Sequence, residues 1–157
     1  MRIKLLNEKG FTLIESLLSL VLFSIIGTVV YFVLLSGLHT EKKIYTETLI
    51  RDEADLVMSQ IIDVLYTAPA TKVKDAAPGN GSLLIYQKDA ANNTTVGFVG
   101  QEPIINGQSI GSSGFDFTNS SIQKIGNSVK IILNVKSKTN QKAKPLSLQS
   151  QFGLLEE

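Results

Sequence analysis

The stretch Gly10-Phe11-Thr12-Leu13-Ile14-Glu15 lies between a short basic leader and an uncharged run from Ser16 to Leu38. This run contains no proline, and at about 1.5 Å per residue it is long enough to cross a hydrocarbon core of roughly 30 Å. We therefore expect a transmembrane helix. Glu15 stands at the mouth of that helix, and an isolated charge near the middle of a span costs roughly 2.5 to 3.5 kcal/mol. This cost indicates that Glu15 has a function.

The motif and its leader, Met1 to Lys9, resemble the amino terminus of a type IV prepilin or pseudopilin. The resemblance implies that a prepilin peptidase cuts after Gly10 on the cytoplasmic face and methylates the new amine of Phe11. It also implies that Glu15 pairs with the amino terminus of a neighbouring subunit during filament assembly. The implied partners are the peptidase, other major and minor pilins or pseudopilins, an assembly platform membrane protein and membrane lipid.

The residues give a physical reason for each of these steps. Gly10 has no side chain, so a peptidase has room to reach the backbone beside it. Basic Arg2, Lys4 and Lys9 hold the leader on the cytoplasmic side. The cut creates a positive amine, and an ammonium from an adjacent chain would neutralise Glu15 where the dielectric is low.

Two alternatives apply to the same segment. Thr12 and Glu15 have the spacing of a capping box, in which Glu15 bonds the Thr12 amide and favours the helix dipole. Capping and subunit pairing can both hold in different states. The second alternative is a secretory signal peptide, but its apolar core is about 7 to 15 residues long and precedes a small-x-small site. No Ala-x-Ala sequence follows Leu38.

Small residues are spread along the apolar run. They either let helices pack closely in the membrane or bond the carbonyls of their own helix. They are Ser19, Ser24, Gly27, Thr28, Ser36 and Gly37. Lysines on both sides of the run weaken the positive-inside argument, so the orientation rests partly on the leader resemblance. That resemblance implies a single-pass protein of the cytoplasmic membrane with its carboxy-terminal domain outside, moving to the pseudopilus or cell surface after assembly.

The helical pattern continues beyond the run. Apolar residues recur every three or four positions at Ile50, Ala54, Val57, Ile61 and Val64, and neither Gly nor Pro interrupts residues 38–68. We expect one helix from Phe11 to Tyr66. Residues 11–38 would form its transmembrane and filament-core half, and residues 39–66 its amphipathic continuation.

After the helix, the spacing of apolar residues changes from the three- or four-residue repeat of a helix to the two-residue repeat of strands. Residues 68–82 and 100–114 have loop composition, whereas Ser128 to Ser137 alternates apolar and polar residues as a half-buried strand does. The other predicted strands are Leu83–Tyr86 and Thr94–Val99, which form a hairpin, Phe115–Thr118 and Leu146–Phe152. The prediction is an α+β fold in which an antiparallel sheet of four to five strands covers the helix. The sheet belongs to a domain of residues 67–157, and residues 1–10 form a leader that precedes the helix.

Composition excludes several function classes. The 157 residues carry a formal charge of +1, with 15 basic and 14 acidic side chains, so no charge bias indicates nucleic-acid binding. One histidine, His39, and no cysteine provide neither a catalytic triad nor a zinc site, and we expect no enzyme activity, cofactor or metal. We expect His39, Asp52 and Glu53 to be solvated.

We interpret the chain as a minor pilin or pseudopilin. Residues 51–65 and 129–135 resemble accessory pseudopilins of the type II secretion J and pilus W kind, and the Gram-positive competence pseudopilins are another close class. The filament would be a type IV pilus, a competence pseudopilus or a type II secretion pseudopilus, and the subunit would act in initiation or assembly. The alternative is a permanently membrane-anchored, single-pass extracellular binding module whose amino terminus only imitates a prepilin.

Overall fold

The computed structural model of the chain describes residues 12–76, 82–89, 92–100 and 102–156. One helix, α1 (Leu13–Leu65), runs without interruption, as its lack of internal proline allows. It agrees with the predicted helix to within two residues at either end. The chain divides into two compact units, residues 1–41 and 42–157, which are described separately.

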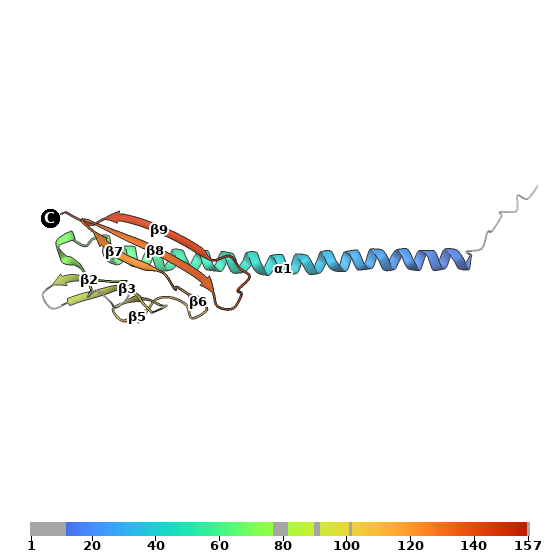
Figure 1. Ribbon diagram of the computed structural model, residues 1–157, viewed down its shortest axis with the longest axis horizontal. Coiled ribbons are helices and arrows are strands. Elements are labelled where there is room, and N and C mark those ends of the chain that lie inside the picture. The colour runs from blue at the N-terminus through green and yellow to red at the C-terminus, as the bar shows by residue number, and fades with distance from the viewer. Residues whose placement is uncertain (1–11, 77–81, 90–91, 101, 157) are drawn as a thin grey trace, which may run out of the picture. The chain divides into compact units, whose positions relative to one another are not determined.

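The described part of the first unit contains only the amino-terminal half of α1 (Figure 1). Every side chain from Thr12 to Glu41 is exposed, although most of them are apolar. Within this half, the Thr28 hydroxyl donates to the carbonyl of Ser24 at 2.9 Å, so Thr28 satisfies its hydroxyl on its own helix. The helix is long and apolar enough to cross a membrane.

In the second unit, α1 buries one stripe of its surface. Ile50, Ala54, Val57, Ile61 and Leu65 are at most 1% exposed, and their spacing of three or four residues places them on one face. The predicted stripe is confirmed except at its end, where Leu65 is fully buried and Val64 only partly.

The first sheet contains five antiparallel strands in chain order. They are β1 (Val73–Asp75), β2 (Ser82–Asp89), β3 (Asn92–Val99), β4 (Glu102–Ile105) and β5 (Gln108–Ser109). The predicted hairpin is confirmed, because β2 pairs with β3 from Ser82↔Phe98 onward. A short 3-10 helix, η1 (Ala70–Lys72), precedes β1, and neither η1 nor β1 was expected within residues 68–82.

The prediction that residues 100–114 form a loop is wrong, because β4 and β5 lie within this range. Asn106 and Gly107 join the two strands, with φ of 53° and 76°. Positive φ at both central residues is the signature of a type I′ turn, and Asn-Gly is its preferred sequence. The sequence therefore already contained a signal for this hairpin, the pair Asn106-Gly107.

The second sheet is built around its longest strand. It contains β6 (Phe115–Asp116), β7 (Ser121–Ile125), β8 (Ser128–Ser137) and β9 (Leu146–Gly153). All three others pair with β8, antiparallel. Val129, Ile131, Leu133 and Val135 of β8 are buried, which confirms the predicted alternation. β7 was not predicted, and β6 has only two of the four expected residues.

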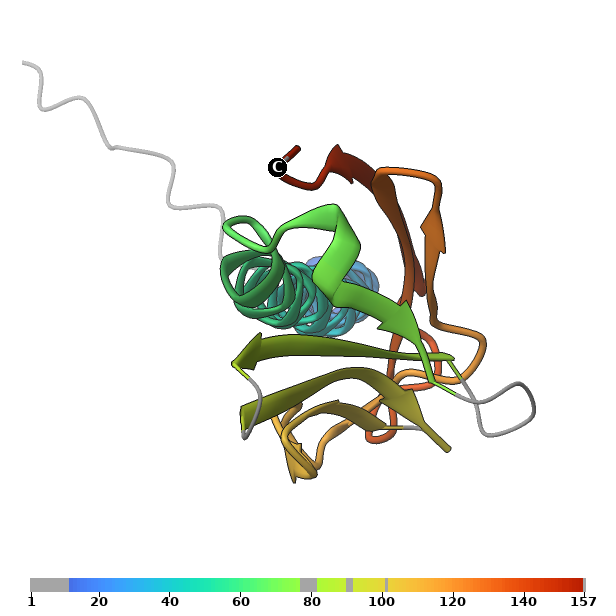
Figure 2. The ribbon, with the colours of Figure 1, turned by 90° about the vertical axis from the view of Figure 1, so that its left-hand side faces the viewer.

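Two sheets, not one, therefore accompany the helix, and the α+β class is confirmed. Viewed along α1, the olive first sheet and the orange-red second sheet stand at an angle on two sides of the green helix segment (Figure 2). Lys124 of β7 connects the sheets, because its Nζ donates to the carbonyls of Ala70 and Val73 at 2.5 and 2.9 Å. The prediction of a single sheet was wrong because β3 continues into the β4–β5 hairpin and does not pair with β8.

Candidate functional site at the amino-terminal helix

The first turn of α1 is closed by a reciprocal set of hydrogen bonds. The Thr12 backbone N–H and hydroxyl donate to Oε2 of Glu15 at 3.0 and 3.1 Å. In return, the Glu15 backbone N–H donates to the Thr12 hydroxyl at 3.3 Å. These bonds form the capping box, so Glu15 caps the helix in this state of the protein. The other two predicted site residues, Gly10 and Phe11, lie outside the described residues.

The cap satisfies backbone donors but leaves the charge of Glu15 uncompensated. A residue that caps a helix contributes about 0.5 to 2 kcal/mol, through hydrogen bonds and the helix dipole. Among the described residues, no cation forms an ion pair with Glu15. The arrangement therefore has a hydrogen-bonded, exposed carboxylate that still requires a counter-charge wherever water is excluded.

The carboxylate is followed by uncovered apolar surface. Leu13 is 78% exposed and Phe23 is 79% exposed, although both are large hydrophobic residues. Exposed apolar patches of this extent occur where a membrane or another protein covers them. The Thr12–Glu15 cap thus begins a segment suited to lipid or to other helices.

Residues 5–31 match the prokaryotic N-terminal methylation motif. The matched segment includes the Thr12–Glu15 cap and more than half of the uncharged run. It supports a type IV pilin-like or pseudopilin-like precursor, a class of structural subunits that is typically non-enzymatic. With α1, it also supports a single-pass membrane anchor. The motif implies prepilin peptidase and other pilins as partners.

Nothing among curated proteins or solved structures matches the chain.

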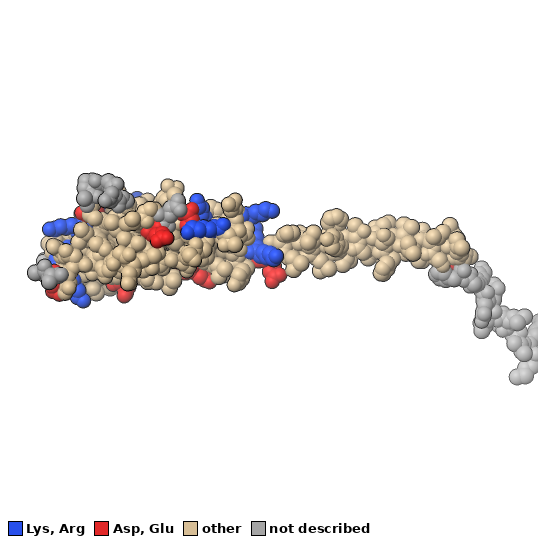
Figure 3. Space-filling view, turned by 90° about the horizontal axis from the view of Figure 1, so that it is seen from below, with Lys and Arg blue, Asp and Glu red and all other residues tan. Residues whose placement is uncertain are grey.

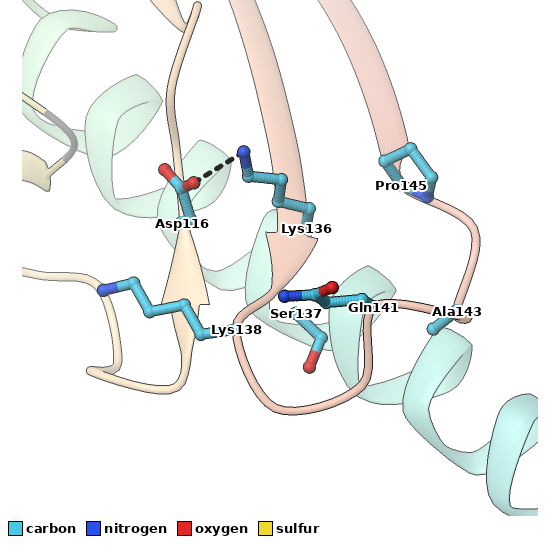
Figure 4. A pocket seen from close by; sticks show the side chains of 7 residues that line it. All are labelled: Asp116, Lys136, Ser137, Lys138, Gln141, Ala143 and Pro145. Carbon is cyan, nitrogen blue, oxygen red and sulfur yellow. Dashed lines mark ion pairs between the residues drawn. The ribbon is translucent and has the colours of Figure 1, made fainter.

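A second candidate is an open pocket of about 440 Å³ in the second unit. Asp116 and Lys136 both line this pocket. Figure 4 shows that Lys136 points toward Asp116, and the Lys136 Nζ and Asp116 Oδ2 atoms are 2.8 Å apart. Burial raises the pKa of Asp116, but hydrogen bonds from Lys136 and Thr118 outweigh burial and lower this pKa to about 2. Asp116 is therefore a permanent anion bound to a lysine, which is unsuited to proton transfer near neutral pH.

The expectation that Glu53 is solvated is wrong. Glu53 is only 7% exposed, and its carboxylate accepts hydrogen bonds from the Ser112 backbone N–H at 2.6 Å and from the Ser112 hydroxyl at 2.7 Å. The neighbouring Asp52 is exposed as expected, and so is His39. Glu53 is thus a tether between α1 and the segment before β6.

A group of lysines was missed in the sequence. Figure 3 shows basic side chains gathered at one end of the second unit. Two segments contribute the exposed lysines of this group. They are Lys42 and Lys43 on α1 and Lys138, Lys142 and Lys144 between β8 and β9. About a hundred residues separate the two sets, so only the fold brings them together. The sole sequence signal was the lysine content of residues 136–144.

Proposed function

We propose that the chain is the precursor of a minor filament subunit, which acts in initiating or assembling a type IV pilus, a competence pseudopilus or a type II secretion pseudopilus. The observation that carries the proposal is the Glu15 cap, which lies inside the methylation motif at the start of an uncovered apolar helix. A carboxylate at this place favours assembly with a partner that supplies positive charge.

The proposed maturation removes residues 1–10. Prepilin peptidase cuts between Gly10 and Phe11 and methylates the Phe11 amine. Residues 11–38 then form the membrane-spanning and filament-core helix, residues 39–66 continue it, and residues 67–157 form the β-sheet domain outside the cytoplasmic membrane. After assembly the subunit lies in the pseudopilus or at the cell surface.

In assembly, Glu15 exchanges its bonds to Thr12 for an ion pair with the Phe11 ammonium of a neighbouring subunit. The cap contributes about 0.5 to 2 kcal/mol. A pair of unit charges 4 Å apart gains about 4 kcal/mol at an effective dielectric constant of 20. The exchange is favourable because only the ion pair neutralises the carboxylate in an apolar setting.

The mass of the amino-terminal peptide from native membranes tests the maturation. A methylated chain that begins at Phe11 supports the filament subunit. An intact Met1 in a functioning protein would instead support the alternative, a permanently anchored single-pass binding module.

A pair of substitutions tests the role of Glu15, because the cap and the charge can be removed separately. Glu15→Gln keeps a residue that completes a capping box but has no charge. Thr12→Val keeps the charge and removes the hydroxyl that caps the helix. We expect Glu15→Gln to reduce co-purification with sibling pilins from native membranes about tenfold or more, the loss of roughly 1.4 kcal/mol of pairing, whereas Thr12→Val retains it. The opposite result would assign Glu15 to capping alone.

A further inference from the structure

The lysines at the end of the second unit form a defined surface, which we call the lysine collar. It comprises Lys42 and Lys43 of α1 and Lys138, Lys142 and Lys144 of the segment between β8 and β9, the β8–β9 loop. All five lysines are exposed.

The β8–β9 loop is bonded to α1 immediately after the two helix lysines. Asn140 Nδ2 donates to the Thr46 hydroxyl at 3.1 Å, and the Lys144 backbone N–H donates to Oε1 of Glu47 at 3.1 Å. Ala143 between them is buried in the core. These contacts use none of the lysine amines of the loop, so the fold holds the collar in place while its charges stay available.

The collar has little internal compensation. On the helix, Lys43 Nζ approaches Oε1 of Glu47 to 3.9 Å. Asp116, which lines a pocket together with Lys138, is already paired with Lys136. The only other neighbouring acid in the sequence is Glu41. The surface is therefore strongly positive and is suited to an anionic partner.

The sequence places the collar near the membrane surface. Lys42 follows Leu38, the last residue of the uncharged run, by four positions, which corresponds to about 6 Å of helix. A headgroup layer extends roughly 5 to 8 Å beyond the hydrocarbon core on each side. Lysines at this depth meet the phosphates of lipid headgroups.

We propose that the lysine collar binds anionic phospholipid headgroups and so docks the second unit on the membrane that α1 spans. This inference requires the membrane span but not the filament, so it can fail while the proposed function stands. Duplex DNA is the other polyanion that such a surface attracts. We favour lipid because the collar directly follows the span, whereas the whole chain carries a formal charge of only +1.

The absence of cysteine allows a single probe to be placed on the loop. The full chain with Thr139→Cys, carrying a fluorophore, is reconstituted in bilayer discs of phosphatidylcholine alone or mixed with phosphatidylglycerol. A quencher attached to a lipid headgroup then reports contact between loop and surface. We expect quenching in the anionic discs that falls as salt is raised.

The matched variants decide the assignment. Lys138→Gln, Lys142→Gln and Lys144→Gln combined should lower the ratio of docked to undocked populations about tenfold or more. The control combines Lys72→Gln, Lys74→Gln and Lys88→Gln, which removes equal charge from η1, β1 and β2 and should retain the quenching. Equal quenching in both kinds of disc, or equal loss in both variants, would overturn the proposal. So would a triple loop variant that loses binding of duplex DNA while its quenching stays unchanged.

Discussion

Two glutamates on α1 differ in their burial and in how far along the chain their hydrogen-bond partners lie. Glu15 is exposed and, among the described residues, bonds only to Thr12, three residues away. Glu53 is buried and bonds to Ser112, 59 residues away. The first can exchange its partner without disturbing the fold, whereas the second closes a long-range contact in the core. The proposed assembly role therefore suits Glu15, whereas the hydrogen bonds of Glu53 serve stability.

Glu53→Ala should destabilise the second unit by about 1 to 3 kcal/mol, because the Ser112 donors lose a charged acceptor. Urea unfolding of the full chain in detergent micelles, followed by tyrosine fluorescence, measures the change. The control is Asp52→Ala, since Asp52 is exposed on the same helix, and its effect should stay within about 0.5 kcal/mol. Equal effects of the two substitutions would contradict the role of Glu53.

At the scale of elements, the close approach of β2 and β3 depends on one glycine. Gly97 of β3 has φ of 152°, and a Cβ atom there would overlap the carbonyl oxygen of Ser82 and lie 2.9 Å from Leu83 Cα. Both neighbours are backbone atoms of β2, so neither can move without disturbing the strand pair.

We expect Gly97→Ala to destabilise the second unit by about 2 kcal/mol or more, through overlap and strain. Hydrogen exchange of the β2 and β3 amides should rise with the loss of stability. Gly153→Ala in β9 is the matched control, because no atom lies within 4 Å of a Cβ atom at that position. If both substitutions left exchange unchanged, the packing described for Gly97 would be wrong.

Elements with strong local signals were predictable. β8 alternates buried and partly buried residues over its first eight positions, and the capping box needs only residues three apart. β7 was missed because it buries a single residue, Ile122. The tether of Glu53 and the lysine collar depend on contacts between distant parts of the chain, which a pattern along the sequence does not contain. The Asn106-Gly107 turn, by contrast, carried a readable signal.

At the scale of the whole molecule, the two units differ in what stabilises them. No described residue before Ile50 is buried, and the core consists of residues from Ile50 to Leu154. The described apolar residues of the first unit, within residues 12–41, are therefore not part of this core. Lipid or neighbouring helices would provide the burial that these described residues lack.

This division predicts that a fragment of residues 42–157 folds by itself. Its free energy of unfolding should equal that of the second unit in the full chain within about 0.5 kcal/mol, because distant sites contribute independently. Urea unfolding of the fragment in buffer and of the full chain in micelles provides the comparison. Glu53→Ala should cost both forms the same amount, since Ser112 lies in the fragment too. A fragment that aggregates or unfolds at much lower urea would mean that the amino-terminal half of α1 supports the domain, and the two units would then have to be treated as one.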